Sequence, residues 1–204
     1  MSRPNFREKV QQAREEAVVD AVERLLADKG FDAMTMDAVV AEVGISKASL
    51  YRHFTSKDEL AAAAMARALE RALQEVARLT AAPGKAIQRL AGLARWAYEQ
   101  QIAGRMPALP AQSSSLRDAL AGDTAYTDRL VQLSTTLSQW IAEAQRDGAI
   151  DAALPSDFVL YTLFARACDP VLGVMRAAGT HSDAQVVDWL VRGWLRSVAP
   201  QATP

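Results

Sequence analysis

Residues 35–54, TMDAVVAEVGISKASLYRHF, contain two short apolar-periodic segments separated by a glycine. The spacing and a threonine at the first N-cap position predict a helix over Met36–Val43. A serine at the second N-cap position predicts another helix over Lys47–Phe54. Gly44 ends the first helix, because a residue without Cβ tolerates the positive φ that a tight turn often needs. Two short helices joined by such a turn are typical of a helix-turn-helix motif.

The second of these helices has one apolar face and one polar face. Leu50 and Phe54 are four residues apart and are expected to face the core. The outward positions are short or polar and form pairs four residues apart, namely Lys47 with Tyr51, Ala48 with Arg52, and Ser49 with His53. Small residues let a helix approach base edges, and flanking donors bind phosphates and bases. We therefore expect this face to enter the major groove of double-stranded DNA.

Charge is distributed unevenly around this motif. The chain has a net charge of −1, yet residues 44–57 contain no acid and three cations, Lys47, Arg52 and Lys57. Ser46 begins a helix whose free backbone N–H groups favour a phosphate. A local basic patch on a nearly neutral chain suits site-specific binding better than general coating of DNA.

Individual side chains in this stretch also have structural explanations. Arg52 could pair with an acid, Tyr51 could be half-buried in the core, and His53 could cap the end of the helix. A metal site is not expected, because His181 is the only other histidine and no cluster of His and Cys occurs in the sequence.

Residues 44–54, GISKASLYRHF, and residues 56–60, SKDEL, resemble the helix-turn-helix signature of the TetR family of bacterial regulators. The resemblance covers about residues 18–60, and the remainder agrees only in length and expected number of helices. It implies a three-helix DNA-binding head, a ligand-binding helical body and dimerisation through the last two long helices. It also implies DNA contacts from Thr35, Ser46, Lys47, Ser49, Tyr51, His53 and Lys57, with Ala48 allowing close approach.

A second reason predicts that Lys57 contacts a phosphate of the DNA. It lies in the first turn of the helix that follows the motif. A lysine there opposes the helix dipole, so a local stabilising role does not explain it.

The composition indicates an all-α globular protein. Hydrophobic residues make up 50% of the 204 residues and charged residues 23%, and the abundance of alanine and leucine favours helix. A single cysteine, Cys168, cannot form an intramolecular disulfide, which fits a reducing compartment. The charged segment 1–16 does not resemble a signal peptide, and Arg166 and Asp169 interrupt the best candidate for a membrane span, residues 158–175. We expect a cytoplasmic protein with no membrane association.

The expected organisation is an N-terminal DNA-binding domain, residues 1–60, and a C-terminal body, residues 80–204. A helix over residues 56–79 connects them and begins with a capping box of Ser56 and Glu59. The other helices are expected at residues 7–29, 85–103, 113–121, 124–147, 155–178 and 182–199.

The last two expected helices, residues 155–178 and 182–199, are apolar around much of their circumference. One face can pack on the core of the same chain, whereas the other needs a partner. We expect a twofold homodimer through these helices, with Val186, Trp189 and Gly193 in the interface.

The body is also the expected site of a small, largely apolar effector, because pockets between packed helices are mostly apolar. The candidate wall residues are Trp96, Gln100, Met106, Trp140, Phe164 and Cys168, with residues 104–112 bordering the entrance. Core packing is the alternative for the tryptophans, and Cys168 could be a small buried hydrophobe.

These features predict a transcriptional regulator, specifically a repressor that leaves a palindromic operator when its effector binds. The alternative is a constitutive DNA-binding or protein-recruiting regulator without a small ligand. An enzyme is not expected, because the sequence has no catalytic dyad, phosphate-binding glycine loop or metal-ligand set. No cofactor is expected either.

Overall fold

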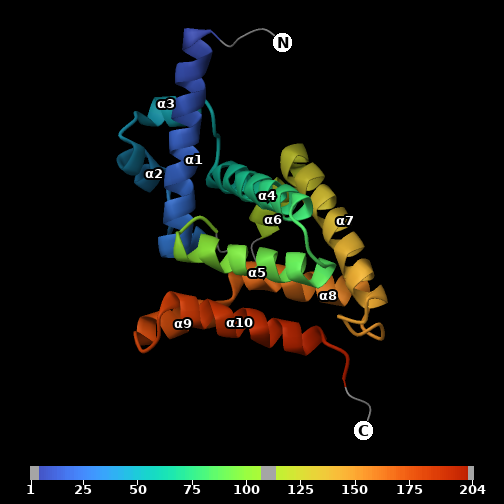
Figure 1. The fold of residues 1–204 in the computed structure, drawn as a ribbon. Helices are drawn as coiled ribbons and strands as arrows, with labels where there is room; N and C mark the ends of the chain where they lie inside the picture. The colour runs from blue at the N-terminus through green and yellow to red at the C-terminus, as the bar shows by residue number, and fades with distance from the viewer. Residues whose placement is uncertain (1–4, 107–113, 202–204) are drawn as a thin grey trace. The chain divides into compact units, whose positions relative to one another are not determined.

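The computed structural model describes residues 5–106 and 114–201. Within these ranges the chain forms helices and no strands, which confirms the expected all-α fold (Figure 1). The elements are α1 (Phe6–Ala33), α2 (Met36–Val43), α3 (Lys47–Tyr51), α4 (Lys57–Ala81), α5 (Ala86–Ile102), α6 (Ser114–Gly122), α7 (Thr124–Arg146), α8 (Ser156–Phe164), the 3-10 helix η1 (Ala165–Cys168), α9 (Pro170–Ala178) and α10 (Asp183–Val198). Most of the expected entrance loop at residues 104–112 lies outside the described residues.

The described residues divide into two compact units, which we call the head and the body. The head comprises residues 5–68 and 114–127, and the body comprises residues 69–106 and 128–201. Helices α4 and α7 each continue from one unit into the other. The division differs from the expected boundary at residue 80, because α6 belongs to the head although it follows α5 in the chain.

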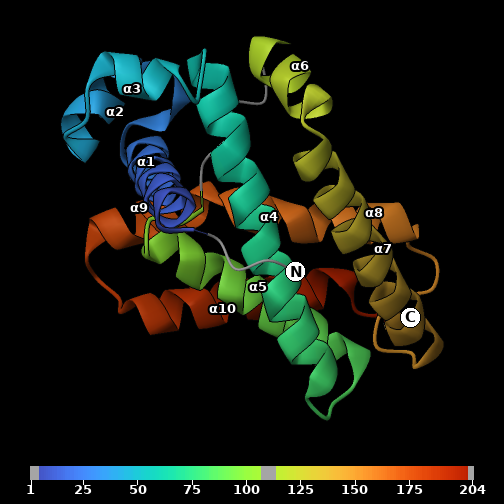
Figure 2. The same cartoon turned by 90° about the horizontal axis from the view of Figure 1, so that it is seen from above.

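The head has a core to which five helices contribute. Helices α2 and α3 lie beside α1, as Figures 1 and 2 both show. Val22, Val39 and Leu50 are fully buried at the centre of this core. Leu116 and Leu120 of α6 are buried in the same core, which explains why α6 belongs to the head.

Gly30 interrupts α1 where the sequence places the end of the first helix. Its backbone is not helical (φ 73°, ψ 172°), and a final turn then extends the element to Ala33. Phe31, in that final turn, is buried in the head core. The glycine therefore redirects the chain so that an aromatic ring covers the helix end.

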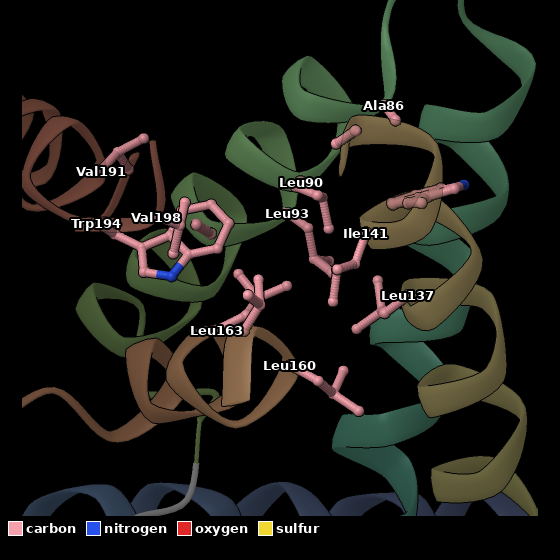
Figure 3. Packing of buried hydrophobic residues seen from close by; sticks show 14 of the residues in the cluster. Ala86, Leu90, Leu93, Leu137, Ile141, Leu160, Leu163, Val191, Trp194 and Val198 are labelled. Atoms are coloured by element: carbon pink, nitrogen blue, oxygen red, sulfur yellow. The ribbon is translucent and has the colours of Figure 1, made fainter. Parts of the chain in front are cut away.

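The body has a separate core built mainly from α5, α7, α8 and α10 (Figure 3). Leu90 and Leu93 of α5 lie between side chains of α7 and α10, and Leu163 of α8 is packed in the same cluster (Figure 3). Helix α5 lies beside α10 along much of its length (Figure 2). Each such buried side chain contributes roughly 1.5–3 kcal/mol of hydrophobic stabilisation, so this packing holds the body together.

The prediction of one continuous helix over residues 155–178 is wrong. Helix α8 ends at Phe164, η1 follows, and Asp169 has an extended backbone (φ −71°, ψ 112°) before α9 begins at Pro170. A proline disfavours helical geometry in the residue before it and tolerates the first position of a helix. Asp169 then caps α9, because its carboxylate accepts a hydrogen bond from the backbone N–H of Val171.

Residues 156–178 are long and apolar enough to cross a membrane by length and composition, contrary to the sequence-based expectation. Those two criteria are weak evidence, because the core helix of a soluble protein also meets them. In the structure this stretch is divided between α8, η1 and α9, and an ion pair between Arg166 and Asp169 lies at the division.

Candidate nucleic-acid interface

Helices α2 and α3 form the predicted helix-turn-helix. Gly44 has the left-handed backbone that the turn needs (φ 72°, ψ 33°). The hydroxyl of Thr35 accepts a hydrogen bond from the N–H of Ala38, and that of Ser46 accepts one from the N–H of Ser49. Both residues are therefore N-caps, and both are exposed. Their DNA contacts stay a prediction that the cap geometry does not test.

Helix α3 is shorter than predicted, because it ends at Tyr51 rather than at Phe54. The carbonyl of Leu50 accepts hydrogen bonds from the N–H groups of both His53 and Phe54, which makes the end of the helix a tight turn. The side chain of Leu50 is buried, and that of Phe54 is packed on the head core. The predicted inward face of this segment is thus found in the structure.

The outward face of α3 presents small and polar residues to solvent. Lys47, Ala48 and Arg52 are exposed, and Ser49 is half-buried. Tyr51 is 48% exposed, so it is not a core residue. This surface has the composition that a major-groove helix needs, with donors around small side chains.

Lys47 has an acidic partner on the preceding helix. Its ammonium Nζ lies 2.7 Å from Oδ1 of Asp37 in the first turn of α2. The hydrogen bond and the negative charge of Asp37 raise the pKa of Lys47, so the lysine is charged at every physiological pH. Sequence reasoning missed this pair, although both residues lie in the motif that we singled out.

His53 is held against α1. Its Nδ1 lies 3.1 Å from Oε1 of Glu15, and its side chain is half-buried. It lines a small crevice together with Arg14, Ser49 and Phe54. The histidine therefore joins the end of the motif to α1. This role differs from the two that the sequence predicted for His53, a DNA contact and a cap of the helix end.

Lys57 has a local role that the sequence did not reveal. Its Nζ donates hydrogen bonds to the backbone carbonyls of Phe31 at 3.0 Å, Asp32 at 3.3 Å and Met34 at 3.4 Å. The ammonium also lies 4.4 Å from the centroid of the Phe31 ring. A cation at the carbonyl end of a helix is stabilising, so Lys57 of α4 caps the end of α1. A phosphate contact was predicted for Lys57 partly because no local stabilising role was apparent in the sequence. The structure shows such a role, so that part of the reasoning is corrected.

A second link between α1 and α4 was not foreseen. The guanidinium of Arg67 lies 2.8 Å from Oε2 of Glu23 and 2.6 Å from Oδ1 of Asp20. Glu23 is buried, which is unusual for a carboxylate and requires a partner. Hydrophobic periodicity places Glu23 on the buried side of α1, and this is the signal that could have identified the pair.

The six candidate effector-wall residues do not share one environment. Gln100 and Trp140 are buried, and Trp96, Met106 and Phe164 are half-buried. Trp140 is a core residue, which agrees with core packing, the alternative to a pocket wall for the tryptophans. The centroid of its ring lies 5.4 Å from the guanidinium carbon of Arg89. The alternative of a small buried hydrophobe is wrong for Cys168, which is exposed in η1.

The three candidate interface residues on α10 also differ from one another. Val186 is buried in the body core, so it is not available to a partner, and its assignment to the interface is corrected. Trp189 is 42% exposed and lies edge-on to His181, with ring centroids 4.8 Å apart. Gly193 is exposed, and a Cβ added there would meet open space.

The arrangement of α2, the Gly44 turn and α3 defines the head as a helix-turn-helix DNA-binding unit. Residues 18–64 match the family model described as bacterial regulatory proteins, tetR family. This match confirms the likeness of the motif to the DNA-binding segment of the tetR family, as the sequence predicted. That family consists of DNA-binding regulators rather than enzymes.

Solved structures share the fold over most of the chain. The fatty acid degradation regulator FadR from Bacillus halodurans has a TM-score of 0.69 and 13% identity, over 95% of this chain and 97% of that one. The ketosteroid transcriptional regulator KstR2 of Mycobacterium tuberculosis has a TM-score of 0.66 and 18% identity, over 92% and 96%. AibR in complex with isovaleryl coenzyme A and operator DNA has a TM-score of 0.59 and 17% identity, over 87% and 96%. At these identities the likeness shows the fold alone. A search of curated protein sequences finds no match.

Proposed function

We propose that this protein is a homodimeric repressor that binds a palindromic operator and releases it when a small, largely apolar effector binds. The observation that carries the proposal is the exposed face of α3, where Lys47, Tyr51 and Arg52 surround small side chains. Donors that flank small residues on an exposed helix after a tight turn fit the major groove. A DNA-binding regulator works where the DNA is, so we place the protein in the bacterial cytoplasm.

Exposed apolar side chains support a second copy of the chain as the partner. Large apolar residues on α8, α9 and α10 are between 42% and 68% exposed, namely Phe158, Tyr161, Val171, Val174 and Trp189. A concentration of such residues on a soluble protein marks an interaction surface. A twofold dimer through these helices would cover them and would present two heads to two half-sites. Gly193 would allow close approach of the partner helix.

The effector site is proposed in the body. AibR has been solved with isovaleryl coenzyme A and operator DNA, so this fold accommodates both kinds of partner in that protein. In the present chain the half-buried Trp96, Met106 and Phe164 are the candidate wall residues best placed to be rearranged by a ligand. Gln100 offers a buried amide, whose Oε1 now accepts a hydrogen bond from Nε of Arg105. Trp140 and Cys168 fit a wall less well, for the reasons given above.

Two helices provide a covalent route from effector to DNA. Both α4 and α7 continue from the body into the head, so a change in the body at either helix acts on the head. An effector that binds one arrangement more tightly than the other shifts the equilibrium between them. A coupling of about 1–3 kcal/mol would weaken operator binding by roughly 5- to 150-fold.

Selection from a random-sequence duplex pool with the purified full chain tests the DNA-binding part of the proposal. We expect enrichment of an inverted repeat, because a twofold dimer reads two equivalent half-sites. The Arg52→Ala variant should enrich the repeat less, whereas Arg146→Ala, an exposed arginine at the end of α7, serves as the matched control. A pool that remains random with the wild type at physiological salt, where sequence-independent binding is weak, would contradict the proposal.

Reciprocal binding tests the effector part. A thermal-shift screen of small apolar molecules identifies a ligand, because ligand binding raises the melting temperature by mass action. Affinity of that ligand should fall by the same factor on the DNA-bound dimer as DNA affinity falls on the ligand-bound dimer. Equal ligand affinity with and without the selected duplex would instead favour the constitutive regulator.

A further inference from the structure

Asp37 is an acidic residue within the proposed DNA-binding motif. Its Oδ1 lies 2.7 Å from Nζ of Lys47, and the pair connects the first turn of α2 to the first turn of α3. Both side chains are largely exposed, 66% for Asp37 and 61% for Lys47. Lys47, the first residue of α3, is therefore neutralised by an acid from the preceding helix, at the surface and in contact with water.

We propose that Asp37 sets the strength of DNA binding by competing with the DNA phosphates for Lys47. The inference rests on the proposed function, because it concerns the same face of α3. A lysine that neutralises a phosphate releases a counterion, and this release drives binding at low salt. When Lys47 turns to a phosphate, however, Asp37 loses its partner and attracts a cation from solution. Net ion release from this lysine is then close to zero, and Asp37 itself repels the nearby phosphates.

Because the pair is exposed, Asp37 weakens the binding of Lys47 to DNA phosphates but does not prevent it. Ion pairs in full contact with water are weakly held, so Lys47 can exchange its partner when DNA arrives. Lys57 shows the opposite case, because its ammonium is directed at three backbone carbonyls and is partly buried. A change at Asp37 should therefore alter DNA affinity with little effect on the fold.

Fluorescence anisotropy with the duplex selected by the wild type, measured over a range of salt concentrations, tests this proposal. Asp37→Asn should bind more tightly than wild type, and its slope of log K against log salt should be steeper by about one unit per head. Lys47→Gln alone should leave the slope almost unchanged, because the neutralised lysine contributes little to it. In the Asp37→Asn background, Lys47→Gln should remove the whole increase in slope.

Glu42→Gln is the matched control. Glu42 lies on the same helix and loses the same charge, but its Oε1 bonds to Nε of Arg24 in α1 rather than to a cation of α3. We expect its slope to stay close to that of the wild type, because Glu42 is paired with Arg24 and not with a lysine of α3. Thermal melts followed by circular dichroism verify folding, and Asp37→Ser replaces Asp37→Asn if the latter is unfolded at the temperature of measurement.

The proposal is overturned if Asp37→Asn binds with unchanged or weaker affinity, or if Glu42→Gln steepens the slope equally. It is also overturned if the gain persists in the Asp37→Asn/Lys47→Gln double variant, because Lys47 would then not mediate it. A wild type that binds no DNA would contradict the proposed function itself, which distinguishes that failure from the failure of this inference.

Discussion

The head and the body hold their polar groups in different ways. In the head, charged side chains of α4 reach across to α1, where Lys57 bonds to the carbonyls at its end and Arg67 bonds to Glu23. In the body, the buried carboxylate of Asp169 lies between η1 and α9. Its Oδ2 accepts a hydrogen bond from the hydroxyl of Tyr98 at 3.0 Å and lies 2.7 Å from Nη1 of Arg166. In the head these groups join α4 to α1, whereas in the body the cluster around Asp169 ties α5 to the point where an apolar stretch is divided between two helices.

This difference shows in which part of the molecule a short stretch of sequence is enough to predict function. The DNA contacts that we propose for α3 depend on the residues of its exposed face, and all of these lie within residues 35–54. The interior of the body acts through packing between distant segments, and Tyr98 and Asp169 are 71 residues apart. Candidate wall residues taken from helical stripes in the body therefore fall into different environments in the structure.

The largest expected effect concerns Arg67, whose loss would leave Glu23 buried without this partner. We predict that Arg67→Met lowers the free energy of unfolding by about 3 kcal/mol, the lower end for a broken buried pair. The Glu23→Leu/Arg67→Met double variant should recover more than half of this loss, because no buried carboxylate remains. Arg24→Met is the control, since both Arg24 and its partner Glu42 are largely exposed, and should cost less than about 0.5 kcal/mol. Urea titrations measure all four proteins, and equal effects at Arg67 and Arg24 would contradict the ranking.

The corresponding change in the body is Asp169→Ala. Burial and the hydrogen bond to Asp169 raise the pKa of the Tyr98 hydroxyl, which therefore remains protonated and needs an acceptor. The variant removes that acceptor, the partner of Arg166 and the cap of α9, and we expect a loss of about 2–3 kcal/mol. Tyr98→Phe should cost only about 1 kcal/mol, because Asp169 keeps its other partners. If the two variants were equally destabilised, the cluster would not be organised around Asp169.

Lys57 distinguishes a structural link from a DNA contact. We predict that Lys57→Ala lowers the free energy of unfolding by about 1–2 kcal/mol, through lost hydrogen bonds to carbonyls and the lost contact with Phe31. The salt dependence of DNA binding should stay unchanged, because the ammonium is used within the head. A slope reduced by about one unit per head would show a phosphate contact after all.

The smallest expected effect is the pH dependence contributed by Glu59. Hydrogen bonds from the backbone and side chain of Thr55 lower the pKa of Glu59 below its ordinary value of 4.5. A carboxyl group with a lowered pKa in the folded state stabilises the protein above pH 4.5, and this contribution is lost as the pH falls further. Because Glu59 is exposed, Glu59→Gln should reduce stability at neutral pH by well under about 1 kcal/mol. Melts of both proteins should converge at acidic pH, and a constant difference would contradict this.

The sequence predicts the head well because its signals are local. The N-caps Thr35 and Ser46 and the turn at Gly44 depend on neighbours within a few residues, and the structure has them as expected. The partners of Lys47 and Lys57 depend on how α1, α2, α3 and α4 pack, and periodicity does not contain that information.

In the body, one local signal was available and was not used. Asp169–Pro170 marks the end of one helix and the start of the next, yet the apolar stripes on both sides suggested continuity. The burial of Val186 could not be derived in this way, because both faces of α10 carry apolar residues. Only packing against the body core decides which of those faces is covered.

The affinity of Tyr51→Ala for the duplex selected by the wild type tests the central claim most directly. Tyr51 is exposed on the outward face of α3, so its removal should leave the fold intact. We predict a loss of roughly 1–3 kcal/mol in DNA binding, the usual scale of one good contact, with an unchanged melting temperature. Val131→Ala, an exposed apolar residue of α7, should bind the duplex as the wild type does. Wild-type affinity in folded Tyr51→Ala would contradict the account, because the face of α3 would then not be the surface that meets DNA.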